Sequence, residues 1–234
     1  MFKILLYSLI LFLVLPSVYS QNVQVKNMPN YDRQWWHPGF TLGFNTSDFV
    51  VKLGGDLNQA DSLYQVTSQS SSGLNLGIVL NLKLHDNFDL RFIPTLTFSA
   101  RELDYTFAKN GVVDHIVSKN VQSTFADFPL DIKFKSVRIN NYRIYVLGGA
   151  KYAIDFVSQS KVKDLNKQIV KLQQNDFGWE LGVGIDIYFE YFKFSPELKV
   201  FHGMRNLLVK ENTAYSNYLD GLFSKIFYIS FCFE

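Results

Sequence analysis

The feature that most constrains this chain is a strict alternation of apolar and polar residues that recurs from Gly39 to the end of the sequence. In the clearest case, residues 73–84, every even position holds Leu or Ile, and the odd positions hold Gly, Asn, Val or Lys. Successive side chains of a β-strand point to opposite faces, so this period of two predicts strands with one apolar and one polar face. We count eight such segments, which are residues 40–44, 73–84, 88–101, 121–135, 142–156, 177–187, 192–200 and 227–233.

The connections between these segments alternate strictly between long and short. The long ones come first, so they lie on one side of the sheet, and both chain ends lie on the other. An even number of alternating segments with long loops on one side is typical of an outer-membrane barrel. We therefore predict an all-β fold, an eight-stranded antiparallel up-and-down transmembrane β-barrel with short periplasmic turns and four long outer loops. The long loops are about 53–71, 108–120, 158–175 and 204–223, and the short turns are 85–87, 136–141 and 189–190.

The alternation does not say which face is outside, and a water-soluble, lipocalin-like barrel is the alternative. A soluble barrel turns its apolar residues inward, whereas a membrane barrel turns them toward lipid. The apolar face here consists of Phe, Leu, Ile and Tyr, which are too bulky for the lumen of eight strands. The polar face holds glycines such as Gly77, Gly178 and Gly182, which suit a narrow interior. We therefore expect the apolar face to contact lipid.

Charged residues of both signs lie on the polar face, and the apolar face of the strand cores carries none. In a membrane barrel these charges point inward, where an unpaired charge is strongly unfavourable. We therefore predict an interior network of ion pairs that closes the lumen. Its predicted members are Arg91, Arg101, Asp127, Asp131, Lys133, Arg143, Lys151, Asp155, Glu180, Asp186, Lys193 and Glu197.

Two local features complete the predicted barrel. After Arg101 the apolar residues change parity to Leu103, Tyr105 and Phe107, which predicts a β-bulge at this point. Aromatic residues near the strand ends suit the two membrane–water interfaces, where such residues form girdles. The predicted interfacial aromatics are Trp35, Trp36, Trp179, Tyr188 and Tyr191.

The N-terminus has the layout of a secretory signal peptide. A short positive start is followed by the apolar run Ile4–Leu15, and a small residue, Ser20, precedes Gln21. This run is shorter than the roughly twenty residues that a membrane-spanning helix needs. We therefore divide the chain into a signal peptide (1–20), a periplasmic N-terminal segment (21–38) and an outer-membrane β-barrel (39–234).

The composition gives little indication of chemistry. A net charge of +2 spread along the chain offers no basic stripe for nucleic acid. Cys232 is the single cysteine, and the four histidines fall in separate connections or strand ends, so neither a metal site nor a catalytic triad is indicated. We expect no enzymatic activity, no cofactor, no metal and no small-molecule substrate, with outer-membrane lipid as the surroundings. A lipid-modifying enzyme acting through His202, at the rim of the apolar face, is an alternative.

Two blocks of sequence carry a resemblance to a known family. The first block is Asn27–Asp32, Trp35, His37, Gly39–Asn45, Asp48 and Phe49, and the second is Phe125, Asp127–Leu130, Lys133–Lys135, Asn140–Arg143 and Leu147–Gly149. Together they resemble the PorT family of the Bacteroidetes, called SprT in gliding bacteria. With the spacing between the blocks, the likeness covers most of the chain after the signal peptide. One departure from the usual barrel pattern is that Glu234 follows the aromatic Phe233 at the end.

The resemblance implies an outer-membrane component of the type IX secretion system. Such a component is needed for export of proteins that carry a C-terminal sorting domain and, in some species, for gliding. Its partners would be other components of that system, with residues 21–37 and the four long loops as the expected docking surfaces. The resemblance implies no catalytic residue. A stand-alone barrel that serves adhesion or membrane integrity is the other reading of the same pattern.

Overall fold

The computed structural model describes residues 25–54, 63–109, 112–157, 172–209 and 219–234. A short 3-10 helix, η1 (Tyr31–Arg33), precedes nine strands. No helix in these described ranges is long and apolar enough to cross a bilayer. The strands are β1 (Trp36–Leu53), β2 (Leu63–Lys83), β3 (Phe88–Phe92), β4 (Thr95–Lys109), β5 (Val112–Lys135), β6 (Tyr142–Asp155), β7 (Asn175–Tyr188), β8 (Lys193–Gly203) and β9 (Leu219–Phe233).

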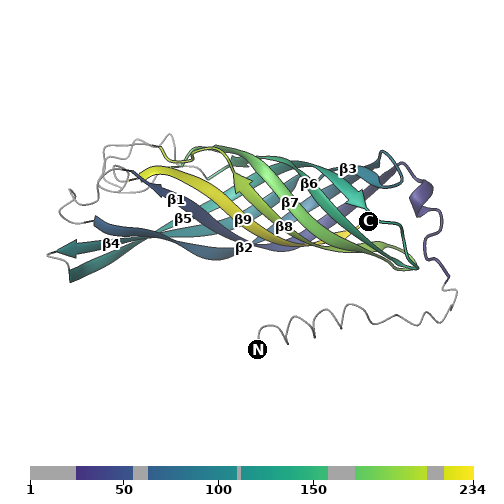
Figure 1. Cartoon of the computed structure of the whole chain (residues 1–234), viewed down its shortest axis with the longest axis horizontal. Coiled ribbons are helices and arrows are strands. Elements are labelled where there is room, and N and C mark those ends of the chain that lie inside the picture. The colour runs from purple at the N-terminus through teal and green to yellow at the C-terminus, as the bar shows by residue number, and fades with distance from the viewer. Residues whose placement is uncertain (1–24, 55–62, 110–111, 158–171, 210–218) are drawn as a thin grey trace, which may run out of the picture.

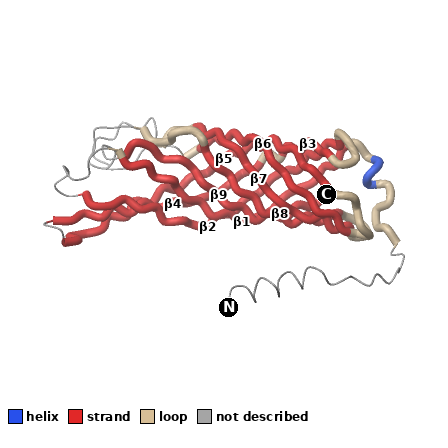
Figure 2. Tube along the Cα trace, viewed as in Figure 1, coloured by secondary structure: helices blue, strands red, loops and turns tan. Residues whose placement is uncertain are grey.

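The strand pairings run in a closed circuit, and all of them are antiparallel. β1 pairs with both β2 and β9, and the pairs from β9 back through β8, β7 and β6 lead to β5. β5 then pairs with β3 and β4, both of which pair with β2. The strands wind around one elongated cylinder (Figures 1 and 2). The predicted all-β antiparallel fold is confirmed.

β3 and β4 are two parts of one barrel strand. Leu80 of β2 faces Phe92 of β3, and Leu76, four residues away, faces Leu96 of β4, so the register is unchanged across the break. The break falls at Pro94, which has no backbone N–H to donate to a neighbouring strand. The eight predicted strands therefore correspond to the nine strands β1 to β9, because β3 and β4 together make up one of them.

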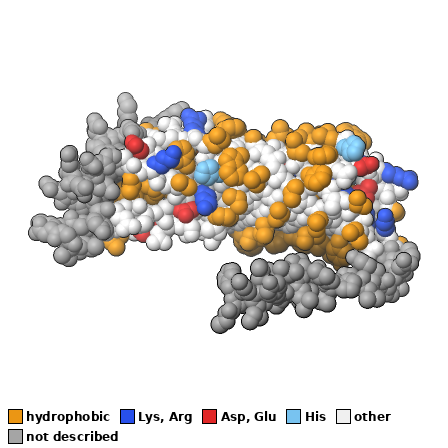
Figure 3. All heavy atoms as spheres, viewed as in Figure 1, with side chains coloured by type: hydrophobic (Ala, Val, Ile, Leu, Met, Phe, Trp, Pro, Cys, Tyr) orange, Lys and Arg blue, Asp and Glu red, His pale blue; other side chains and the backbone are white. Residues whose placement is uncertain are grey.

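The apolar face lies on the outside of the cylinder. Leu76 and Ile185 expose 48% and 44% of their surface, whereas Arg91 and Glu180 expose 0% and 1%. Figure 3 shows hydrophobic side chains over the middle of the wall, with charged side chains toward its two ends. This is the arrangement that a lipid environment favours, because only the outer wall contacts hydrocarbon.

The predicted bulge after Arg101 was wrong. β4 and β5 keep one register from the pair Thr95–Asp127 to the pair Phe107–His115. Arg101 and Leu103 are both fully buried, so the strand continues without a slip. The change of pattern arises because the inward-facing side chains change from polar to apolar toward the end of the barrel that lies away from the two chain termini. We call this end the outer end. The register shift in this region lies in β2, between Ser70 and Leu74, where it faces β4.

Two of the predicted long loops are largely strand. β2 begins at Leu63 and β5 at Val112, so most of the predicted loop 108–120 belongs to the β4–β5 hairpin. We call residues 63–70, 101–109 and 112–123 of β2, β4 and β5 the outer sheet. Its strands reach beyond the other strands at one end of the cylinder (Figure 1). The sequence pattern missed it because a strand outside the bilayer has no lipid-facing row of apolar residues.

Candidate functional site

Buried ion pairs cross the interior of the barrel. Lys133 of β5 lies 2.8 Å from a carboxylate oxygen of Asp186 on β7, and Ser195 of β8 donates a hydrogen bond of 2.7 Å to the same carboxylate. Near them, Lys135 lies 2.5 Å from Asp89 of β3. Lys133 and Asp186 come from strands that are separated by β6, so this pair reaches across the inner wall past one strand. The other two contacts join neighbouring strands, β5 with β3 and β8 with β7.

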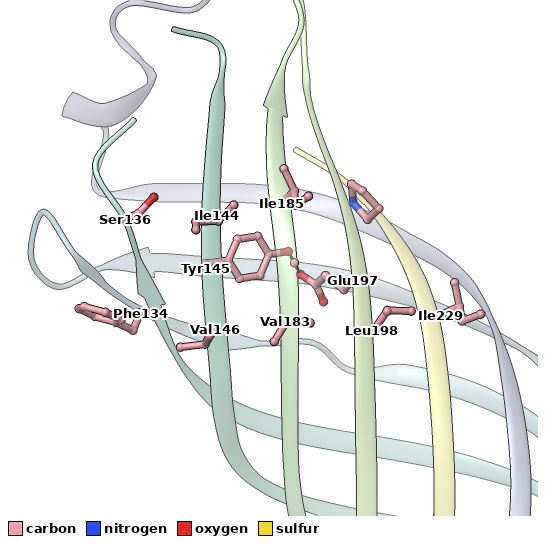
Figure 4. Close-up of a pocket in the computed structure, with 12 residues that line it drawn as sticks. Phe134, Ser136, Ile144, Tyr145, Val146, Val183, Ile185, Glu197, Leu198 and Ile229 are labelled. Atoms are coloured by element: carbon pink, nitrogen blue, oxygen red, sulfur yellow. Dashed lines mark hydrogen bonds between the residues drawn. The ribbon is translucent and has the colours of Figure 1, made fainter. Parts of the chain in front are cut away.

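The pair Arg91–Glu197 joins opposite sides of the barrel, from β3 to β8. The Tyr145 hydroxyl donates a second hydrogen bond, 2.5 Å long, to Glu197 (Figure 4). Tyr145 can reach this position because residue 184 of the facing strand is glycine. A Cβ atom there would lie 2.4 Å from the Tyr145 ring. On the lipid side of the same region, a groove of about 530 Å³ runs over Val146 and Val183.

Further pairs fill the middle of the interior. Lys199 lies 3.1 Å from Glu180, and Lys151 lies 3.4 Å from Asp127. The Tyr228 hydroxyl donates to Asp127 at 3.2 Å and accepts a hydrogen bond of 2.6 Å from Lys151. Each charge in this group therefore has a partner of opposite sign or a hydroxyl group, as buried charges require.

Three predicted network residues form no ion pair with a described residue. Arg101 lies between the rings of Phe49 and Phe125, at 4.4 and 4.9 Å from their centroids, and donates to a serine hydroxyl. Asp155 accepts a hydrogen bond of 2.9 Å from the backbone N–H two residues later. Asp131 is fully buried.

Sequence reasoning missed several polar partners of these charges. Tyr145 and Tyr228 each bind a buried carboxylate through their hydroxyl groups. Glu234 points inward as well, with its side chain fully buried. The period of two could have found Glu234, because Phe233 faces outward and the next residue must then face inward.

The N-terminal segment closes the mouth of the barrel at the end of the short turns, which we call the periplasmic mouth after the orientation predicted from the sequence. Tyr31 stacks on His37 with ring centroids 4.0 Å apart and lies edge-on to Tyr188 at 5.6 Å. Its hydroxyl donates a 2.9 Å hydrogen bond to Glu234, which also binds Lys193 at 2.8 Å. Burial and the neighbouring Glu234 carboxylate raise the pKa of the Tyr31 hydroxyl, which keeps it protonated as the donor. Burial disfavours the charged form of Glu234, but Lys193 and Arg91 outweigh this effect and lower its pKa to about 2.

Two further contacts hold the same segment against the barrel. Asp32 lies 3.0 Å from the guanidinium of Arg143, another predicted network residue. The backbone N–H of Asn27 donates to the side chain of Asn141 at 2.9 Å, and Arg138 donates to the backbone carbonyl of Asn27. Residues 27–37 therefore pack on their own barrel, and strand β1 begins at Trp36, slightly before the predicted boundary at residue 39.

A small cavity lies in the middle of the interior, lined by Asp127, Glu180 and Glu197 among others, with a volume of about 20 Å³. A single water molecule needs about 10–15 Å³ measured in this way. At the outer end, the interior is filled by an apolar cluster, which we call the outer plug. It consists of Phe49, Val66, Leu103, Tyr105, Leu172, Leu207, Leu208, Leu219 and Leu222.

Four of the five predicted interfacial aromatics lie on the outer surface. Trp35, Trp36, Trp179 and Tyr191 are exposed. The placement of Tyr188 was wrong, because it is buried in the periplasmic mouth with 1% of its surface exposed. On β7 the outward positions have odd numbers, so an even residue faces the lumen.

The described residues include no group of His, Cys, Asp and Glu that could hold a metal ion. His37 stacks on Tyr31 in the periplasmic mouth, and His202 lies 5.5 Å from the ring of Trp179 on the outer wall. Residues 1–24, most of the predicted loop 158–175 and residues 210–218 of the predicted loop 204–223 lie outside the described ranges.

Comparisons with known proteins give the family of the sequence. The model of a family described as "Outer membrane protein beta-barrel domain" matches residues 20–209. The structure is similar to that of OprG from Pseudomonas aeruginosa, with 13% identity over 85% of this chain and 91% of that chain and a TM-score of 0.46. It is also similar to Neisserial surface protein A, with 9% identity over 85% and 98% of the two chains and a TM-score of 0.42. No curated protein matches the sequence. The family match supports a place in the bacterial outer membrane.

Proposed function

This chain belongs to the family of outer-membrane β-barrel domains, and from that premise we propose that it is a non-enzymatic component of the type IX secretion system. In this role it acts by docking to partner proteins of the system. It is needed for export of cargo with a C-terminal sorting domain and, in some species, for gliding.

The observation that carries this proposal is the meeting of the two sequence blocks that resemble PorT. Asn27 and Asp32 of the first block contact Asn141 and Arg143 of the second, although more than a hundred residues separate the two members of each contact. The same contacts close the periplasmic mouth. Residues 27–32 of the first block and 140–143 of the second therefore form one structural unit at the mouth of the barrel that we expect to face the periplasm.

The closed interior supports a docking role over a conducting one. A cavity of about 20 Å³ offers no path to an exported polypeptide. A closed barrel can contribute to secretion only by holding or orienting other components. The exposed aromatic pair Trp35–Trp36, next to the closed mouth, is available for such contacts or for the membrane interface.

Gene deletion and complementation in the native bacterium test the proposal. We expect deletion to abolish secretion of a sorting-domain cargo and the intact gene to restore it. A variant with Asp32→Ala and Tyr31→Ala, which loosens the mouth, should restore secretion only partly if its amount in the membrane equals that of the wild type. Normal secretion in the deletion strain would contradict the proposal.

Two parallel measurements separate the alternatives. If the deletion strain secretes normally but becomes permeable to detergents or fails to adhere, the chain is a stand-alone barrel. If His202→Ala changes the lipid profile and leaves secretion intact, the chain is a lipid-modifying enzyme. Affinity purification from the native membrane should recover other secretion components with the wild-type protein.

A further inference from the structure

A broad apolar groove lies on the outer wall of the barrel and crosses strands β6, β7 and β8. Its volume is about 1010 Å³, which equals the upper end of the range of about 300–1,000 Å³ that is usual for ligand pockets. Gly148 of β6 faces outward between Ile132 of β5 and Leu181 of β7, and it forms part of the floor because it has no side chain. The groove continues over Val146 and Val183 into the smaller groove of about 530 Å³ (Figure 4). The wall therefore has room for a long apolar ligand.

Two basic side chains lie at the rim of this groove that is nearer the outer end of the barrel. His202 of β8 and Lys225 of β9 face each other across the strand pair. The ring of His202 lies 5.5 Å from that of Trp179, and the Lys225 ammonium lies 5.3 Å from the ring centroid of Phe227. Trp179 and Phe227 both line the groove. The basic pair therefore lies directly beyond the apolar part of the site, where Figure 3 shows the hydrophobic band giving way to Lys, Arg and His side chains.

The Lys225 ammonium is available to an anion. In the part of the chain that the structure describes, it has no ion pair and no hydrogen bond. Asp48 of β1 faces Lys225 across the β1–β9 pair, but its carboxylate accepts the backbone N–H of Phe49 at 2.7 Å. A further cation, Lys52, lies over the ring of Phe223 on the same side of the barrel, with 4.7 Å from the ammonium to the ring centroid. A cation at the boundary of the hydrocarbon attracts an anionic lipid headgroup.

We propose that the groove and the basic pair together bind one lipid molecule with an anionic, phosphate-bearing headgroup. The phosphate lies between Lys225 and His202, and an acyl chain lies in the groove over Leu181 and Leu198. An apolar groove with cations at one end matches the two parts of such a lipid, and the positive charge favours it over a lipid without net charge. No covalent bond forms or breaks. The inference goes beyond the secretion role and does not depend on it.

A second copy of this chain fits the same site poorly. Two copies in one membrane share the same orientation, so a symmetric dimer has its two-fold axis along the membrane normal. A dimer centred on the groove would place Lys225 of both copies at the same depth of the membrane. Like charges that face each other in an interface are unfavourable. A lipid instead brings the opposite charge to this position.

Native mass spectrometry of the purified protein tests the proposal. The protein is taken from vesicles that contain equal amounts of phosphatidylglycerol, which is anionic, and phosphatidylcholine, which has no net charge, with identical acyl chains. We expect at least five-fold more bound phosphatidylglycerol, which is about the effect of one cation near a membrane surface. Lys225→Gln should abolish this preference. The matched control is Lys83→Gln, which removes one positive charge at the other end of the barrel, where Lys83 already pairs with Asp86 at 2.8 Å, and should keep the preference.

A second pair of variants tests the groove. Val183→Trp fills it from a side chain that is 53% exposed, and it should lower the amount of bound lipid at least five-fold. Leu42→Trp is the control, because Leu42 is 43% exposed on β1, outside the groove, and its replacement should leave the bound lipid unchanged. Migration on gels without heating checks first that each variant is folded.

Two measurements on the wild type do not depend on the folding of any variant. The preference for phosphatidylglycerol should fall as the concentration of the volatile salt rises, because salt screens exposed charges. Glycerol phosphate, which has the headgroup chemistry without acyl chains, should not displace the bound lipid at equal concentration. Equal binding of the two lipids, an unchanged preference in Lys225→Gln, equal losses in the two Trp variants, or displacement by glycerol phosphate would each overturn the proposal. A wild-type dimer that Val183→Trp dissociates would overturn it as well, because the groove would then be an interface between copies.

Discussion

At the scale of single residues, the interior charges define how the barrel closes. A buried ion pair often adds little net stability over an apolar pair, because both charges must leave water. Removing one partner has a much larger effect, because the other charge stays buried without compensation. The carboxylate of Asp186 lies within 4 Å of Lys133 and Lys193 and accepts a hydrogen bond from Ser195. Such a shared carboxylate should be among the least replaceable residues of the interior.

Replacing Asp186 with Ala should therefore lower the free energy of unfolding by about 3–5 kcal/mol. The physical reason is that the buried ammonium group of Lys133 loses its counter-charge, whereas Lys193 keeps its ion pair with Glu234. Reversible unfolding by guanidinium in lipid vesicles measures this effect. The matched control is Asp86→Ala, which breaks a 2.8 Å pair with Lys83 in an exposed periplasmic turn and should cause no measurable loss. Equal losses in the two variants would contradict the prediction.

Glu234 should make the stability of the periplasmic mouth depend on pH. Its pKa in the folded chain is about 2, against 4.5 for an ordinary glutamate. A lowered pKa stabilises the fold above pH 4.5, and this contribution is lost as the pH falls through 2. Wild type should exceed Glu234→Gln by about 3 kcal/mol at pH 6, and the difference should vanish near pH 2. Unfolding curves of both proteins between these pH values measure it, and a constant difference would refute this role.

At the scale of elements, a single strand can pass through two environments with different rules. The outward residues of β4 are apolar at Leu96 and Phe98 and polar at Glu102 and Asp104, while its inward residues change from Arg101 to Leu103. In the membrane part of the barrel, the outward side chains contact lipid and the inward side chains are charged. In the outer sheet, the outward side chains contact water and the inward side chains form an apolar core. The outer plug is therefore built like the core of a soluble protein, on top of a membrane barrel.

Leu103 should behave as a core residue of this plug. It is fully buried, so Leu103→Ala should lower the free energy of unfolding by about 2–5 kcal/mol through lost burial and a remaining cavity. Leu96→Ala on the same strand is the control, since Leu96 faces lipid with 46% of its surface exposed and leaves no cavity. Its replacement should have a clearly smaller effect in the same measurement. A larger effect at Leu96 than at Leu103 would mean that Leu103 does not pack inside the barrel.

At the scale of the whole molecule, the alternation of residues predicts the barrel and its orientation because lipid acts on every outward position at once. Residues such as Leu76 and Arg91 could therefore be assigned to a face without coordinates. Contacts that depend on three-dimensional closure could not be predicted in this way. The packing of Tyr31 against Glu234 joins residues from the two ends of the sequence, and the interior position of Leu103 depends on where the membrane ends.

Closure at three levels predicts that the purified protein conducts no steady ion current in a planar bilayer. Tyr31 fills the periplasmic mouth, ion pairs cross the middle around a cavity of about 20 Å³, and the outer plug fills the other end. Removing one layer leaves the other two in place, so Tyr31→Ala alone should also show no steady current. Folding of both proteins is checked first by their migration on gels without heating. A large and stable conductance of the wild type would show that the interior is open in the membrane, and it would remove the main reason for assigning the barrel a docking role.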